Sequence, residues 1–235
     1  MIFGHRYSVS GRLTLDTNHL GGRWPCFLAA HQFTEFYGRN PEDVEWLERL
    51  EIEHDNLRAA LSWTLERGRA ELALRLTAAS LRFWEAHGHY SEGRTWLEKA
   101  LEKEGCASSA VRAKALYAMS LMAHLQYDTN RAEAAAQEGL KLSAEAMIDG
   151  SFAASFQIMM GRAARLRGDF QSAKELLEES FKLSRDADDR LGIADALREL
   201  AAVSSLTGDR AKAKALYEEG IVLCRELTSC GSAIS

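Results

Sequence analysis

The chain has 235 residues, of which 46% are hydrophobic and 27% charged, and this composition excludes a largely disordered protein. Its formal net charge of −5 disfavours a dedicated nucleic-acid binder, because phosphate neutralisation requires a clustered excess of Lys and Arg. The four cysteines form no C-x-x-C pair, the N-terminus has no apolar signal segment, and no stretch approaches the ~18 apolar residues of a membrane span. We therefore expect a cytoplasmic protein with reduced thiols.

The beginning of the chain predicts little regular structure. Residues 1–23 contain four glycines and no helical period, which is typical of a poorly structured segment or, over Ser8–Leu15, of a brief strand. Residues 24–69 predict N-terminal helices that lead into the rest of the fold, the first of them over Phe27–Tyr37. A clear helix start follows at Asn40-Pro41, because Asn caps helices and Pro suits the first helical position.

Apolar residues recur at helical spacing after this start, until Gly68 ends the pattern. They are Trp46, Leu47, Leu50, Leu57, Leu61 and Leu65. The polar segment His54-Asp55-Asn56 interrupts the run and leaves two interpretations open, one long helix or two shorter ones.

From residue 70 onward the chain repeats one design at a nearly constant period. The middle residues of four turn segments are Gly88, Tyr127, Gly168 and Gly208, so the spacings are 39, 41 and 40 residues. A fixed period of this size predicts stacked supersecondary units. The glycines suit a left-handed residue at the end of a helix, and the Asp that follows Gly168 and Gly208 suits the cap of the next helix.

Small residues flank these turns where two antiparallel helices would approach most closely. The pairs are Gly161 with Ala173, Ala201 with Ala213 and Ser120 with Ala132, while in the first unit Gly93 is paired with the larger Leu81. Helix axes near the low end of ~8–10 Å require such small side chains. Larger residues are expected to fill the gaps between hairpins, namely Trp84, Leu97, Leu177, Phe181 and Tyr217.

These observations predict an all-α fold, a right-handed α-α superhelix of about four to five helical hairpins. We expect helices over about 70–87, 90–103, 108–126, 129–147, 150–167, 170–186, 189–207 and 209–227. The four repeats of the array 70–227 then occupy 70–105, 108–147, 150–187 and 189–227, and 228–235 form a disordered tail. The last helix carries Leu216, Ile221, Leu223 and Leu227, so this end of the array should expose an apolar face.

The third and fourth units resemble the tetratricopeptide repeat. The residues that carry the resemblance are Gly161, Gly168-Asp169-Phe170 and Ala173, and then Ala201, Gly208-Asp209, Ala213 and Tyr217. Upstream, residues 46–63 and 81–101 are similar to the helical-repeat region of large bacterial signalling ATPases and transcriptional regulators. Such regulators carry a G-x-x-x-x-G-K-[ST] phosphate-binding loop, which these 235 residues lack. The resemblance therefore implies the helical-repeat arm alone, without the nucleotide-binding domain and its ATPase activity.

No motif predicts a catalytic, cofactor or metal site. His87 and His89 lie on either side of a helix end, so they do not share one helical face as a metal-binding pair would. His54 and Asp55 are adjacent and point about 100° apart on a helix, which argues against a base and its orienting carboxylate. We therefore expect no enzyme activity, no cofactor and no metal.

A mostly cationic set of residues is expected on the concave face, which the first helix of each pair lines in this architecture. The set is Arg75, Arg82, Lys114, Tyr117, His124, Arg162, Arg165 and Arg198. Because Arg matches carboxylates with two parallel donors, the set predicts a groove for an acidic peptide. The alternative is ordinary solvated charge that is partly paired with Glu85, Asp195 and Glu199, and the sequence leaves both readings open.

The leading functional hypothesis is a protein-interaction scaffold or sensor arm of a bacterial regulator. Its expected partner is a protein or peptide, acidic in character, or another domain of the parent regulator, with no membrane or direct nucleic-acid partner. Two alternatives stay open. One is a repeat domain that senses a small-molecule inducer for an ATPase domain outside these residues, and the other is a structural arm that oligomerises through its exposed end.

Overall fold

The computed structural model describes residues 41–103, 107–146 and 150–231. The expectations for residues 1–23, for a strand over Ser8–Leu15 and for a helix over Phe27–Tyr37 lie outside the described residues, as does the segment 232–235. The regular elements within the described ranges are all α-helices, which confirms the predicted all-α class. None of these described helices is both long and apolar enough to cross a membrane.

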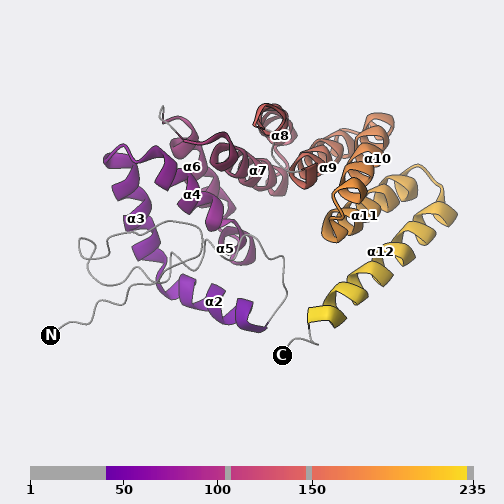
Figure 1. The fold of residues 1–235 in the computed structure, drawn as a ribbon, viewed down its shortest axis with the longest axis horizontal. Coiled ribbons are helices and arrows are strands. Elements are labelled where there is room, and N and C mark those ends of the chain that lie inside the picture. Colours follow the sequence, from indigo (N-terminus) through magenta and orange to yellow (C-terminus); the bar gives the residue numbers. More distant parts are fainter. Residues whose placement is uncertain (1–40, 104–106, 147–149, 232–235) are drawn as a thin grey trace.

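The helices follow an arc whose two ends, α2 and α12, lie on the same side of the molecule (Figure 1). They are α2 Pro41–Ile52, α3 His54–Glu66, α4 Ala70–Ala79, α5 Leu81–Ala86, α6 Tyr90–Leu101, α7 Ser109–Leu125, α8 Thr129–Glu145, α9 Gly150–Leu166, α10 Phe170–Asp186, α11 Arg190–Leu206 and α12 Arg210–Gly231. Helices α7 and α8, α9 and α10, and α11 and α12 pack as hairpins. Contacts of α4 with α7, α7 with α9 and α9 with α11 stack the hairpins into an α-α solenoid.

One apolar core runs through the whole stack. Trp84, Leu97 and Leu177 are fully buried, as expected of residues that fill the gaps between hairpins. Phe181 is partly buried against the same core. Tyr217 is 41% exposed, because no described helix follows α12 to cover it. The prediction that these residues fill the gaps between hairpins is therefore confirmed inside the array, whereas Tyr217 in the last described helix is only partly covered.

The small residues beside the turns face each other across their hairpins, as predicted. Gly161 on α9 lies against α10, where an added Cβ atom would stand 2.8 Å from Cδ2 of Leu177 and 3.5 Å from the carbonyl oxygen of Ala173. In the preceding hairpin, Oγ of Ser120 donates a 2.8 Å hydrogen bond to the carbonyl oxygen of Ala132. Helix axes this close leave no room for larger side chains at these positions.

The turns inside the hairpins share a left-handed residue at the end of the first helix. Gly168 and Gly208 have φ angles of 81° and 89°, and the Asp that follows each of them accepts a hydrogen bond from a backbone N–H of the next helix. Tyr127 adopts the same left-handed conformation with a φ of 59° although it is not glycine. The predicted combination of a helix stop and an N-cap is therefore present.

Three boundaries add detail to the expected helices. The predicted helix over 70–87 is divided at Ser80, whose Oγ donates a 2.9 Å hydrogen bond to the carbonyl of Leu76, and such back-bonding bends helices. The apolar run before Gly68 forms two helices rather than one, since α2 ends at Ile52 and α3 begins at His54. Helix α12 continues to Gly231, so residues 228–231, which we expected to begin a disordered tail, are helical.

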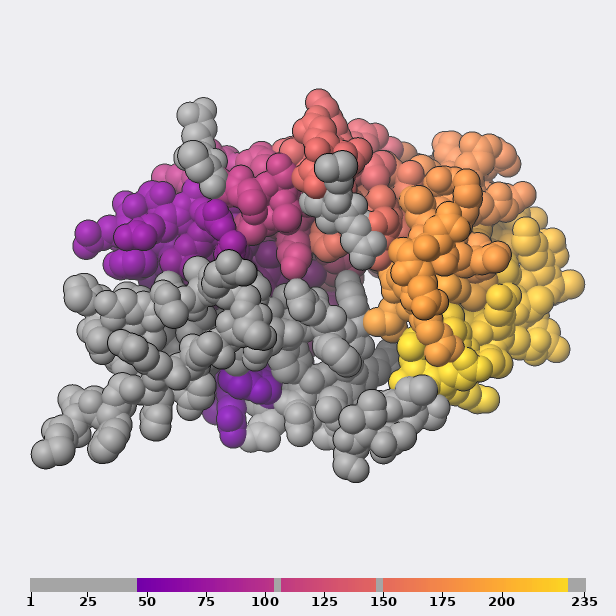
Figure 2. All heavy atoms as spheres, viewed as in Figure 1, coloured from indigo at the N-terminus to yellow at the C-terminus, as the bar shows by residue number. Residues whose placement is uncertain are grey.

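The C-terminal end of the stack exposes apolar side chains, as the sequence suggested. Ile221 and Val222 are 49% and 54% exposed, and Leu216, Leu223 and Leu227 are only half-buried. Figure 2 shows α12, in yellow, at the outer edge of the molecule beyond α11. The last described helix therefore has no neighbouring helix on its outer side in the described part of the chain.

Candidate interaction surface

The first helix of each pair lies beside the first helix of the next, and these helices carry all eight predicted groove residues. The positions are Arg75 on α4, Arg82 on α5, Lys114, Tyr117 and His124 on α7, Arg162 and Arg165 on α9, and Arg198 on α11. Because α4 contacts α7, α7 contacts α9 and α9 contacts α11, the helices form one continuous side of the stack. The residues nevertheless fall into two groups with different surroundings.

Arg162 is the centre of a buried ion-pair network between α9 and α11. Only 9% of its side chain is exposed, and Nη2 lies 2.8 Å from both carboxylate oxygens of Asp195. Its Nε donates a 2.8 Å hydrogen bond to Oε1 of Glu199. Burial opposes the positive charge, but the carboxylates of Asp195 and Glu199 keep the pKa of Arg162 above its ordinary value. Arg162 is therefore a structural link between repeats rather than an open binding residue.

Glu199 is 2% exposed and forms ion pairs with two further arginines. Arg165 Nε lies 3.3 Å from Oε2, and Arg198 Nη2 lies 2.7 Å from Oε1. Burial alone would raise the pKa of Glu199, yet the Arg162 and Arg198 guanidiniums hold it below its ordinary value. Three guanidiniums therefore surround two carboxylates, those of Asp195 and Glu199, which leaves one positive charge in excess.

His124 lies close enough to this network to be influenced by its charges. Burial, and after it the charge of the Arg162 guanidinium, lower the pKa of His124 to about 4, so the imidazole is neutral near pH 7. Its Nδ1 atom is buried and makes no hydrogen bond in the described structure. Tyr117 packs edge-on against Phe152 and Phe156, with ring centroids 6.1 Å apart in both cases. Both α7 residues therefore contribute apolar or neutral surface rather than charge.

The remaining arginines form local pairs within their own helices. Arg75 pairs with Glu71 one turn earlier on α4, and Arg82 pairs with Glu85 on α5. Exposed or half-exposed pairs of this kind contribute little free energy. The structure thus brings together Arg162, Arg165 and Arg198 from the predicted stripe, and it pairs much of the stripe's charge internally.

A pocket opens beside Arg198, between α11 and α12. Its walls are formed by Ala194, Arg198, Leu216, Tyr217, Gly220, Ile221, Cys224 and Arg225, and most of the lining is apolar. The Arg198 side chain is 54% exposed, and its contacts with Asp195 and Glu199 use Nε and Nη2. This arrangement places a guanidinium next to apolar surface at the C-terminal end of the described stack.

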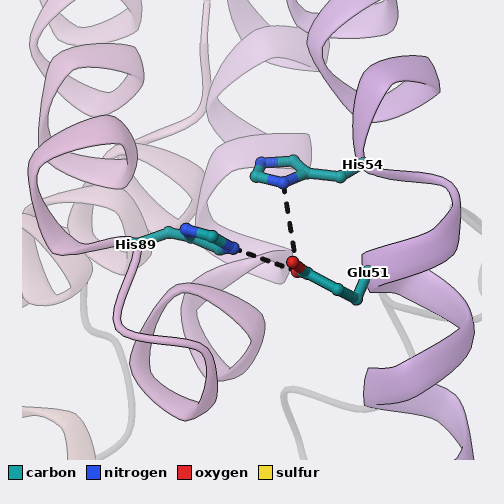
Figure 3. A group of neighbouring side chains, drawn as sticks. All are labelled: Glu51, His54 and His89. Carbon is teal, nitrogen blue, oxygen red and sulfur yellow. Dashed lines mark hydrogen bonds and ion pairs between the residues drawn. The ribbon is translucent and has the colours of Figure 1, made fainter.

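A second cluster lies at the N-terminal corner, and the sequence did not reveal it. Oε2 of Glu51 has the side chains of His54, His87 and His89 around it (Figure 3 draws Glu51, His54 and His89). The sequence singled out these histidines separately, but Glu51 and His89 are 38 positions apart. That separation is close to one repeat period, which is the signal that could have placed the two residues side by side.

Comparison with known proteins supports the repeat architecture. Residues 152–226 match the family model of the tetratricopeptide repeat. Over 187 residues the chain is 28% identical to proteins of Mycobacterium bovis and Mycobacterium tuberculosis whose names place them among HTH-type transcriptional regulators. The match includes 76% of this chain but only 20% of each relative, so the chain spans about a fifth of the length of these curated relatives.

Solved structures with a similar arrangement of helices include two from Podospora anserina. Two crystal structures of TPR-like repeats, named after a kinesin light chain, superpose with TM-scores of 0.54 and 0.51 at 19% identity. The first covers 88% of this chain and 98% of the solved chain, and the second covers 86% and 96%. At this level of identity the likeness concerns the fold alone, and it confirms that the chain forms an α-α solenoid of TPR-like repeats.

Proposed function

We propose that this chain is the protein-binding arm of a bacterial signalling or transcriptional regulator. The solenoid fold, the tetratricopeptide match and the names of the mycobacterial relatives support this proposal. TPR-like arrays present a rigid curved surface, so little conformational entropy is lost when a partner segment docks. In such a role the α7, α9 and α11 side of the stack receives the partner.

The observation that carries the proposal is the position of Arg198 beside the apolar pocket. Arg165 and Arg198 belong to a network with one surplus positive charge, and Arg198 is its most exposed member. Tyr217 and Ile221 supply apolar surface next to it. A partner segment with a carboxylate beside an aliphatic side chain matches this combination, because the guanidinium pairs with the carboxylate and the pocket buries the aliphatic group.

The test is binding of short acidic-aliphatic peptides, measured by fluorescence anisotropy. We expect Arg198→Glu to weaken binding by about tenfold or more, because it replaces an attractive charge with a repulsive one. Lys182→Glu is the matched control, since it makes the same charge change at an exposed position on α10, away from this surface. Arg162 is unsuitable as a test position, because its replacement leaves Glu199 buried without its main partner.

Two results would contradict the proposal. One is a wild-type chain that binds none of the acidic-aliphatic peptides at low ionic strength, where charge attraction is strongest. The other is equal affinity for the wild type and Arg198→Glu, with both proteins folded by circular dichroism.

A further inference from the structure

Three histidines surround one carboxylate where α2 and α3 meet the turn between α5 and α6. Nε2 of His89 lies 3.0 Å from Oε2 of Glu51, and Nδ1 of His54 lies 3.9 Å from the same oxygen. The donor atoms of Glu51, His54 and His89 all lie within 4.8 Å of one another. In Figure 3 the His54 and His89 rings converge on the Glu51 carboxylate from two different parts of the chain.

A second carboxylate lies beside the ring of His54. Its Nε2 atom lies 3.2 Å from Oε2 of Glu92, on the side of the ring away from Glu51. Glu92 in turn accepts two 2.7 Å hydrogen bonds from Arg58 and one of 3.3 Å from Nε1 of Trp96. A proton on Nε2 of His54 therefore has an anionic neighbour, and the lone pair of Nδ1 faces Glu51. Metal-binding histidines commonly have a carboxylate beside the outer ring nitrogen. Glu92 occupies this position, although Nε2 of His54 forms no hydrogen bond with it in this structure.

His87 lies beside the three residues, and a hydrogen bond holds its outer ring nitrogen. Its Nε2 lies 3.2 Å from the carbonyl oxygen of Leu47, which favours a proton on Nε2. Its Nδ1 lies 3.7 Å from Oε2 of Glu51. A fourth donor atom, the nitrogen of His87, therefore lies next to the triad.

We propose that Glu51, His54 and His89 bind a Zn²⁺ ion. Zinc prefers imidazole nitrogen and carboxylate oxygen at about 2.0–2.2 Å in a tetrahedron, which places neighbouring donors roughly 3.4 Å apart. The distances of 3.0 and 3.9 Å from Glu51 to the two nitrogens lie on both sides of this value. All three donors lie within 4.8 Å of one another, so rotations of these side chains that close the remaining gap bring the donors to one ion. A ligand set of nitrogen and carboxylate oxygen also disfavours Mg²⁺ and Ca²⁺, which prefer oxygen alone.

Zinc at this position would clamp the entry helices onto the array. Glu51 belongs to α2, His54 begins α3, and His89 precedes α6, so one ion would link α2 and α3 to the turn that precedes α6. His54 also packs edge-on against Phe83 of the core, with ring centroids 4.9 Å apart, which couples the ion to the first hairpin.

The test is Zn²⁺ titration of the tag-free full chain after treatment with a chelator, by calorimetry or competition with a zinc indicator. We expect one Zn²⁺ per chain, and Glu51→Gln and His89→Gln to lower the affinity at least about tenfold. Both side chains are partly exposed, at 43% and 28%, so these variants should fold. Glu48→Gln is the matched control, because Glu48 is an exposed carboxylate on the same helix.

Substitution by Co²⁺ gives a second readout that does not depend on stability. A tetrahedral nitrogen-oxygen site should give the strong visible absorption of four-coordinate Co²⁺, and His89→Gln should remove it. Zn²⁺ that binds His89→Gln as tightly as the wild type resides elsewhere in the chain and overturns the proposal. A folded wild type that takes up no Zn²⁺ overturns it as well.

Discussion

The missing side chain at Gly161 sets how closely α9 approaches α10. An added Cβ atom would stand 2.8 Å from Cδ2 and from Cγ of Leu177, so this fully buried side chain would have to shift. We predict that Gly161→Ala lowers the free energy of unfolding by about 1–3 kcal/mol through overpacking, despite the better helix propensity of Ala. Urea unfolding followed by circular dichroism measures the change.

The control for this prediction lies on the same helix. A Cβ atom at Gly150 meets no atom within 4 Å, so Gly150→Ala should keep or slightly raise the free energy of unfolding. Equal losses in the two variants would show that close packing is not the reason for the glycine at 161.

His124 makes the stability of the fold depend on pH. Its pKa is lowered by burial from 6.5 to about 4 in the folded chain, so between these values the unfolded chain binds more protons than the folded one. The stabilisation is fully present above about pH 6.5 and is lost as the pH falls towards 4. We predict a smaller decrease of the unfolding free energy between about pH 7 and pH 5 in His124→Gln than in the wild type, measured by urea unfolding. The same decrease in both proteins would refute this role of His124.

A side chain at the left-handed position of a turn should lower the free energy of unfolding, because its Cβ atom strains the backbone. Tyr127 has a φ of 59° and is 79% exposed, so its ring contributes little packing while its Cβ strains the backbone. We predict that Tyr127→Gly raises the free energy of unfolding by up to about 1 kcal/mol.

The reciprocal change Gly168→Ala should lower the free energy of unfolding by about 1 kcal/mol, because no neighbouring atom lies within 4 Å of the new Cβ and only the backbone is strained. Thermal unfolding of both variants measures the effect, and changes of the same sign would contradict the argument.

Helix positions were largely predictable from sequence because local residues fix them. The expected helix over 170–186 has the same bounds as the observed α10. Its start is fixed locally, because Gly168 ends the preceding helix and the next residue, Asp169, caps α10. The bend at Ser80 was not predictable from the apolar pattern. At the bend, the hydroxyl of Ser80 donates a hydrogen bond to the carbonyl oxygen of Leu76. A serine in a helix can choose among several hydrogen-bond partners, so the sequence alone does not reveal this one.

The candidate sites were predictable only in part, because their pairs span neighbouring repeats. The sequence indicated that Arg162 and Arg198 face one side of the stack, but the register between α9 and α11 decides which carboxylates meet them. Asp195 and Glu199 lie 33 and 37 positions after Arg162, and a shift by one helical position would separate them. The same reasoning explains why Glu51 and His89 were not joined into one cluster.

At the scale of the molecule, each helix pair depends on its neighbours for burial, so the ends of the stack are less protected than its middle. Helix α9 contacts α7, α8, α10 and α11, whereas α12 packs mainly against α11 and exposes Ile221 and Val222. Stability in such arrays is close to a sum of nearest-neighbour terms, and local opening is easiest where neighbours are few. The proposed peptide surface beside Arg198 therefore lies on the least protected part of the described array, where a bound partner would also stabilise the fold.

Hydrogen exchange of the native chain, followed by mass spectrometry, should reveal this gradient. We predict the slowest amide exchange in α9 and the fastest among the repeat helices in α12, because opening α12 exposes one interface and opening α9 exposes several. Leu177→Ala, which removes a fully buried side chain at a cost of about 2–5 kcal/mol, should speed exchange in the central helices as well as at the end. Tyr217→Ala at the uncovered end should speed exchange in α11 and α12 alone. Uniform exchange along the array, or the same pattern in both variants, would mean that the stack opens as one cooperative unit and not from its C-terminal end.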